Sequence, residues 1–325
     1  MNWKIFAILA VLCTCLMAPS CSADPFRPPE PPPSPPAQGG TQEAGGASAT
    51  GGLPVAVSGS SSIAGAAGAS SSTSQAFDWP VCNKQAPRKL SPETLERYRR
   101  SLMPARAEPM HARPKASYRV LDLPDALWAP YAHSLNQRVG SCTGNAAIGW
   151  RVGQPWVWRG TLDPILLENY AESVYSDATR IDPFPGSWPP DDTGSDGESV
   201  MTVMTRRGLV GSWQTVYTFE GVQRALQSGP CIIGSNWHTS MFSPNACGQV
   251  DVSGAVEGGH EYVWRGVQYS TKRGLFTNSW DDDYGTKDSQ GRGGYFWMTF
   301  GNIQKLLNEG ADMQCGQAIG FDWPD

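Results

Sequence analysis

Between residues 24 and 76 the chain has almost no large apolar side chains, and this tract limits where a fold can lie. Residues 24–38 are dense in proline, and residues 39–75 consist largely of glycine, alanine and serine. Such a composition buries too little apolar surface to offset the entropy of ordering the chain. We therefore expect residues 24–76 to form a disordered linker that is stiff at first and flexible afterwards.

The residues before this linker are typical of a secretory signal peptide. Lys4 precedes an apolar run that ends at Ala18, and small residues follow. The run is too short for a membrane span. Cleavage after Ala23 would remove residues 1–23 and release a soluble protein, whereas cleavage before Cys21 would leave that thiol to be lipidated. Both remain open, so we expect an exported protein, either extracellular or lipid-anchored in a bacterial cell envelope.

The cysteine count gives a first indication of chemistry. The chain has eight cysteines, and the ones beyond the linker are Cys82, Cys142, Cys231, Cys247 and Cys315. An odd number in an exported chain suggests one reactive thiol beside up to two disulfides. If Cys142 is the reactive thiol, the sequence leaves the pairing of the other four open.

Charge and motif spacing argue against several function classes. The formal net charge of −5 gives no electrostatic reason to bind nucleic acid. Asp191-Asp192 and the acidic run at 281–283 do not match a calcium-binding loop, and no cysteine–histidine spacing fits zinc. We expect no metal, no cofactor and a monomeric protein.

Residues 77–117 contain a helix signal ahead of the globular part. Ser91 can cap a helix that has Pro92 in its first turn, and apolar residues such as Leu95 and Tyr98 follow at helical spacing. Two interpretations stay open for this helical segment. It is an inhibitory prosegment, or it is a helix packed permanently on the body of the protein.

The remainder of the chain, residues 118–325, predicts an α+β catalytic domain. The helical patterns precede most of the alternating patterns typical of strands, which indicates a helical part followed by an antiparallel β-sheet. A cleft between two such subdomains is a usual place for an active site. The predicted helices are 142–150, 164–176, 198–207 and 220–227, and the predicted strands are 231–234, 262–269, 274–278 and 295–300.

Three residues form a candidate catalytic constellation. Cys142 opens a predicted helix, where unsatisfied backbone N–H groups stabilise a thiolate. His260 stands at the entry to one predicted strand and Asn278 at the end of the next, so pairing of the two strands would let the Asn278 amide hold the imidazole in one tautomer. Trp280 follows and can cover that hydrogen bond. The spacing therefore predicts a Cys-His-Asn triad.

These motifs resemble those of the papain-like cysteine peptidases, more a bacterial or phage branch than the plant and lysosomal enzymes. The resemblance rests on Gly-Ser-Cys at Cys142, Gly-His at His260, Asn-Ser-Trp at Asn278 and Gly-Tyr-Phe at Gly294, in that order. It covers about residues 121–307 and implies a two-subdomain fold with the active site in the cleft. It implies Cys142 as nucleophile, His260 as general base and acid, Asn278 as its orienting group and Trp280 as shield.

The same resemblance implies an oxyanion-binding amide and a substrate pocket. The family's fixed spacing puts the amide at Asn136, whereas Gln137 fits if one residue is deleted; Gln137 is favoured because a shortened loop still delivers the longer amide. The glycines Gly258, Gly259 and Gly234 are expected near the pocket for the second residue before the cut.

The sequence thus predicts an exported cysteine endopeptidase that cleaves peptide or protein substrates through an acyl-enzyme. Two alternatives remain. One is a cell-wall peptide amidase or endopeptidase, or an acyl-transferring enzyme, with the same cysteine–histidine chemistry. The other is a non-enzymatic binding module on a papain-like fold.

Overall fold

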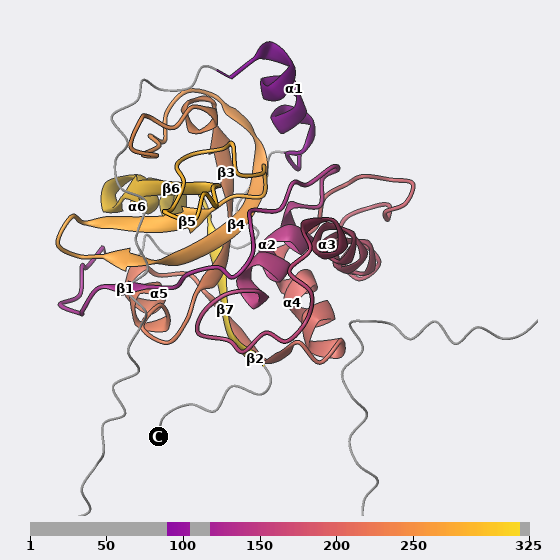
Figure 1. Ribbon diagram of the computed structural model, residues 1–325, viewed down its shortest axis with the longest axis horizontal. Helices are drawn as coiled ribbons and strands as arrows, with labels where there is room; N and C mark the ends of the chain where they lie inside the picture. The colour runs from indigo at the N-terminus through magenta and orange to yellow at the C-terminus, as the bar shows by residue number, and fades with distance from the viewer. Residues whose placement is uncertain (1–89, 105–117, 319–325) are drawn as a thin grey trace, which may run out of the picture. The chain divides into compact units, whose positions relative to one another are not determined.

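The structure is a computed structural model that describes residues 90–104 and 118–318 (Figure 1). The expected signal peptide, the linker and Cys82 lie outside these residues. None of the helices in the described ranges is long and apolar enough to cross a membrane. The expected α+β organisation is confirmed, because three packed helices precede a sheet whose paired strands are all antiparallel.

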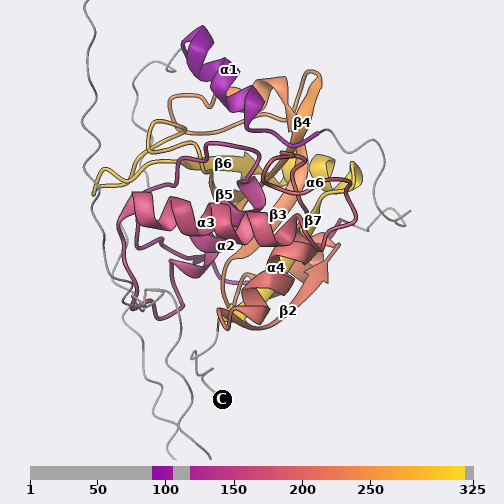
Figure 2. The ribbon, with the colours of Figure 1, turned by 90° about the vertical axis from the view of Figure 1, so that its right-hand side faces the viewer.

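The helical part consists of α2 (Cys142–Arg151), α3 (Pro164–Ala178) and α4 (Gly197–Arg206), which pack against one another (Figure 2). Asp163 and Asp196 cap α3 and α4, each accepting hydrogen bonds from backbone N–H groups of the first turn. These caps satisfy donors that a helix start otherwise leaves unpaired. The two capping aspartates therefore fix the points at which α3 and α4 begin.

The sheet has seven strands, six of them in the order β2-β7-β3-β4-β5-β6, with β1 paired to β4. β3 and β4 form its centre, and the side chains of β3 are almost all buried. The helices α5 and α6 lie beside the sheet, and a short 3₁₀ turn, η1, follows β3. The bounds are β1 Ala126–Leu127, β2 Val210–Val216, α5 Phe219–Ala225, β3 Cys231–His238, η1 Thr239–Phe242, β4 Val256–Gln268, β5 Arg273–Thr277, β6 Tyr295–Thr299, α6 Phe300–Asn308 and β7 Asp312–Ala318.

An aromatic core holds the sheet to its neighbouring elements. Trp237, Trp264 and Trp280 are fully buried in it, together with phenylalanines and tyrosines from β4, β5 and β6. A disulfide joins Cys231 in β3 to Cys315 in β7, two neighbouring strands. The sheet is therefore a rigid frame for the side chains that lie where it meets the helices.

The sequence prediction was wrong in the lengths of two strands, and it missed the elements β1, β2, β7 and α6. β3 continues to His238 and β4 begins at Val256, so Gly258 and Gly259 lie inside a strand rather than before it. β2 and β7 were not predicted, because their polar residues show little apolar alternation. They form strands since each pairs with the other and β7 also pairs with the buried strand β3.

The helix expected at Ser91 is α1 (Pro92–Arg100), and the Ser91 hydroxyl accepts from the Thr94 N–H. Tyr98 is its one fully buried residue and belongs to the core of the sheet. Beyond α1 the chain forms an antiparallel bridge between Met103 and Gly259. Residues 92–104, called the covering segment below, are thus joined to the central strand β4.

Candidate active site

Cys142 is the first residue of α2, and its thiol is in no disulfide. The preceding residue, Ser141, makes no side-chain cap, because its hydroxyl donates to Asn145 instead. No acidic residue lies in the first turn. The positive end of the helix dipole therefore faces the thiol without a competing carboxylate on the same turn, which favours negative charge on sulfur.

His260 and Asn278 are brought together by the antiparallel pairing of β4 with β5. Val263 lies opposite Thr277, so His260 and Asn278 are diagonal neighbours on one face of the sheet. Their side chains form a hydrogen bond of 2.8 Å between His260 Nε2 and Asn278 Oδ1. The sequence-predicted pair is therefore in contact.

This hydrogen bond fixes the tautomer of the imidazole. Asn278 Oδ1 also accepts from the Ser279 N–H at 2.7 Å, so the atom facing His260 is the amide oxygen. An amide oxygen can only accept, and Nε2 must carry the proton. Nδ1 is buried and makes no hydrogen bond with the described residues. The neutral ring thus keeps a basic lone pair on Nδ1.

Burial controls the charge of His260. The side chain is fully buried, and this desolvation lowers the pKa of His260 from 6.5 to about 4, although the Asn278 hydrogen bond opposes the shift. Trp280 stacks on the imidazole with ring centroids 4.7 Å apart, and Trp237 presents an edge at 4.9 Å. Trp280 therefore stands where a shield for the His260–Asn278 bond would stand.

The two candidate oxyanion amides differ in burial. Gln137 is 2% exposed, and its Nε2 donates to Val139 O at 3.1 Å and to Ser101 O at 2.8 Å. Its amide oxygen accepts from Ser279, which orients the NH₂ group. The Asn136 side chain is exposed, while its backbone N–H donates to Glu168. Only the Gln137 amide is therefore held in the interior.

Ser101, whose carbonyl accepts the hydrogen bond from Gln137 Nε2, belongs to the covering segment. Ser101 Oγ also accepts from Trp280 Nε1 at 2.9 Å, and Tyr98 stacks on the Trp280 indole at 4.4 Å between centroids. Two ion pairs at the edge, Arg97–Asp281 and Arg99–Glu257, join the segment to the body. The sequence analysis did not predict the contact between Ser101 and Gln137, because only the fold brings residue 101 to residue 137.

Beyond Ser101 the covering segment runs between two glycine-rich walls. Met103 exchanges two 2.9 Å backbone hydrogen bonds with Gly259, and a Cβ at Gly258 would lie 2.6 Å from Met103 O. On the other wall, a Cβ at Gly194 would lie 2.6 Å from the Met103 side chain. Gly258 and Gly259 on one side and Gly194 on the other thus flank the covering segment, and the space between them that it fills is called the groove below. The sequence analysis did not select Gly194. Gly234 lies within β3, opposite Glu261 and Asp312.

A hydrogen-bonded carboxylate stands beside the nucleophile loop. Asp192 accepts from the Gly140 N–H, with the shorter contact at 2.9 Å, and from the Tyr175 hydroxyl at 2.6 Å. Burial, and next the Asp192 hydrogen bond, hold the pKa of Tyr175 well above its usual range. Tyr175 therefore remains a neutral donor. In the sequence, Asp191-Asp192 had been considered only as a calcium motif.

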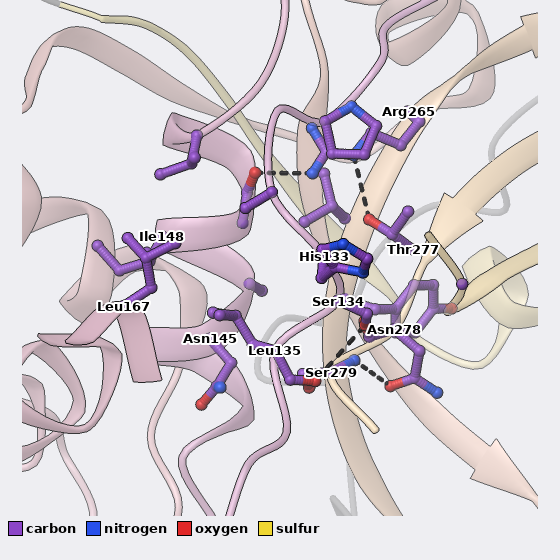
Figure 3. A pocket seen from close by; sticks show the side chains of 18 residues that line it. His133, Ser134, Leu135, Asn145, Ile148, Leu167, Arg265, Thr277, Asn278 and Ser279 are labelled. Carbon is purple, nitrogen blue, oxygen red and sulfur yellow. Dashed lines mark hydrogen bonds between the residues drawn. The ribbon is translucent and has the colours of Figure 1, made fainter. Parts of the chain in front are cut away.

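A cavity lies behind the catalytic candidates, where the helices meet the sheet (Figure 3). Asn145, Ile148 and Leu167 line it from α2 and α3, and Arg265 and Asn278 from the sheet side. Cys142 and His260 do not line it. The covering segment instead contacts Gln137 and Gly259, and Gly259 directly precedes His260 in the chain.

Comparisons with known proteins give matches in structure alone. No protein-family model and no curated sequence matches the chain. Xylellain, a cysteine protease from Xylella fastidiosa, aligns at 14% identity over 68% of this chain and 97% of its own, with a TM-score of 0.47. The proform of the ragweed pollen protease Amb a 11 aligns at 13% identity over 69% and 76%, with a TM-score of 0.44. Procathepsin B from Trypanosoma congolense aligns at 16% identity over 69% and 88%, with a TM-score of 0.38. Among solved structures, this chain is similar to cysteine proteases, the class that its sequence motifs also resemble.

Proposed function

We propose that this chain is an exported cysteine peptidase with a Cys142–His260–Asn278 triad. The observation that carries the proposal is the His260 Nε2–Asn278 Oδ1 hydrogen bond, which leaves Nδ1 as the basic nitrogen. His260 lies on β4, the strand against which α2 packs, and α2 begins at Cys142. A nucleophile, a base and a group that orients the base are the three parts that acyl transfer requires.

The proposed reaction has two stages. The Nδ1 lone pair of His260 takes the thiol proton as Cys142 Sγ attacks the scissile carbonyl, and the imidazolium formed in this way passes that proton to the leaving amine. The carbon–nitrogen bond breaks and a thioester forms. His260 then takes a proton from water, the hydroxide attacks the thioester, and the acid product leaves as Cys142 is regenerated. This chemistry uses no metal and no cofactor.

Gln137 is proposed as the side-chain donor to the oxyanion, in preference to Asn136. Its buried Nε2 already donates to a carbonyl oxygen, that of Ser101, at 2.8 Å. The backbone N–H of Cys142 would be the second donor. A preorganised pair of donors in a site shielded from water stabilises the charge that develops in the transition state.

The covering segment is proposed to hold the enzyme latent, so that residues 92–104 act as an inhibitory prosegment. The Ser101 carbonyl accepts the hydrogen bond that Gln137 would donate to the oxyanion. Met103 fills the groove between Gly194 and Gly259. A substrate and this segment cannot both be bound. The alternative, a permanently packed helix, would leave no route for a peptide to reach Cys142.

The direction of the covering segment explains how it would escape cleavage. We propose that the leaving, C-terminal part of a substrate lies at the Trp280 end, beside the imidazole that protonates the leaving amine, and that the acyl part lies at the Gly194 end. The covering segment runs the other way, from Tyr98 on Trp280 to Met103 on Gly194. In that arrangement the covering segment would be bound in the direction opposite to that of a substrate.

Export is proposed from the sequence signal and from the oxidised cysteines. Cys231 and Cys315 form a disulfide, and Cys247 is also disulfide-bonded. Structural disulfides persist mainly in oxidising compartments. Whether the mature protein is free or anchored through Cys21 is a separate question, which mass spectrometry of the mature N-terminus answers.

Labelling with a thiol-directed vinyl-sulfone peptide tests the proposal. The full chain and a Tyr98→Ala variant, in which the covering segment is weakened, are compared with Cys142→Ser and His260→Ala in the same Tyr98→Ala background. We expect labelling at Cys142 that is lost in both of these variants. Labelling that persists in Cys142→Ser, or that maps to Cys247, would overturn the assignment. Digestion of purified peptidoglycan but not of denatured protein would instead favour the cell-wall alternative.

A further inference from the structure

The loop that carries Asp192 lies directly beside the nucleophile. Gly140 is two residues before Cys142, a stretch that spans at most about 7 Å, and its backbone N–H donates to both Asp192 oxygens, at 3.1 and 2.9 Å. The approach is tight, since a Cβ at Gly140 would lie 2.6 Å from Asp192 Oδ1. The carboxylate is therefore fixed against the wall of the groove next to the reacting sulfur.

The same loop forms the wall of the groove on the acyl side. Gly194, two residues after Asp192, contacts the side chain of Met103, which pairs with Gly259 across the groove. Asp192 is therefore hydrogen-bonded to the nucleophile loop and lies two residues before the contact with Met103. When a substrate replaces the covering segment, the residue that supplies the scissile carbonyl lies at this point.

The Asp192 carboxylate also keeps capacity for a ligand. Its two neighbours are the neutral Tyr175 hydroxyl and a backbone N–H, whereas a carboxylate offers about four acceptor positions. The side chain is exposed, and the residues that the structure describes include no cation paired with it. An anion that is held rigidly, open to solvent and without a counter-ion is suited to a guanidinium or ammonium group.

We propose that Asp192 sets the substrate preference of this enzyme, selecting arginine or lysine as the residue that supplies the scissile carbonyl. This inference rests on the peptidase function proposed above. The cation of the substrate side chain pairs with Asp192 while its carbonyl lies on Gln137. Because the site is open to water, the preference is moderate: an exposed ion pair with a charge-assisted hydrogen bond corresponds to about five- to tenfold.

The test compares kcat/KM for two fluorogenic peptides that differ only in arginine against citrulline before the cut, since citrulline has the same shape without the charge. The full chain carrying Tyr98→Ala is used, because the covering segment would hold the native enzyme latent, and the Asp192 and Asp191 variants are made in this same background. We expect a ratio of about five to ten that falls to about one or two in Asp192→Asn. The ratio should also fall as salt is raised.

Asp191→Asn is the matched control, since it removes the same charge one residue away. Asp191 is exposed, and its side chain makes no hydrogen bond that the described residues record. We expect it to keep the ratio. A ratio near one in the Tyr98→Ala chain, or an unchanged ratio when Asp192→Asn is added to it, overturns the inference while cleavage itself continues. Cleavage of neither peptide, or cleavage that survives Cys142→Ser, overturns the proposed function instead.

Discussion

Replacing Tyr98 by alanine should release the covering segment and expose Cys142. The ring is 1% exposed, stacks on Trp280 with an interplanar angle of 9°, and meets Tyr284 edge-on at 6.2 Å. Truncating a buried aromatic side chain to alanine costs about 3–5 kcal/mol. The hydroxyl adds little, because its contact with Trp280 O is 3.4 Å long. We therefore take about 3 kcal/mol as the loss.

This loss falls on the equilibrium between the covered and the uncovered protein, provided that the body stays folded. At 1.36 kcal/mol per tenfold, about 3 kcal/mol raises the uncovered population roughly 150-fold. While the uncovered form is a minority, the labelling rate of Cys142 is proportional to its population. The second-order rate constant for labelling should rise by at least about tenfold even if neighbouring side chains refill most of the space.

Tyr98→Phe is the matched control, because it keeps the stacked ring and removes only the hydroxyl. Its labelling rate should stay within about twofold of the native rate, since a long hydrogen bond contributes little. Thermal melting followed by tryptophan fluorescence separates release from unfolding of the body. The reasoning is refuted if Tyr98→Ala remains folded and labels at the native rate, or if Tyr98→Phe labels as fast as Tyr98→Ala.

The remaining predictions concern the oxyanion amide, the disulfide and the buried imidazole. Gln137→Ala should lower kcat about 10²–10³-fold, as loss of one oxyanion donor does, whereas Asn136→Ala should change it little; steady-state kinetics on one peptide compares them, and equal losses would contradict the assignment. Replacing Cys231 and Cys315 together by alanine should lower the free energy of unfolding by about 4 kcal/mol, because the bond closes a long loop of 84 residues; urea titration measures this, and an unchanged midpoint would refute it. The pKa of His260 is about 4 in the folded protein and 6.5 in the unfolded chain. The neutral imidazole therefore contributes fully to the free energy of unfolding above pH 6.5. This contribution, up to roughly 3 kcal/mol, is lost as the pH falls towards 4. Urea midpoints between pH 7 and 4.5 should therefore fall less in His260→Gln than in the native protein, and parallel decreases in the two would contradict this.

Local sequence signals predicted α1 to α5 well and missed α6. Ser91, with proline after it, gave the start of α1, and the cysteine, proline and acidic signals gave α2, α3 and α4 to within one or two residues. These signals act within a few residues, through caps and backbone geometry. The polar strands β2 and β7 carried no such signal, since their structure depends on pairing with distant strands.

For the site, the sequence by itself determined the chemical groups: a thiol at a helix start, one histidine and one asparagine on neighbouring strands, and a tryptophan after them. Residue order and strand spacing restrict these choices, because antiparallel pairing makes diagonal neighbours of His260 and Asn278. Only the tertiary structure decided which amide is buried beside them, Gln137 rather than Asn136, and what fills the groove. Contacts such as Ser101 with Gln137 and Asp192 with Gly140 join residues 36 and 52 positions apart, and a local sequence pattern does not encode separations of that size. They arise from the packing of whole elements, which sets the occupancy and the charge of the groove.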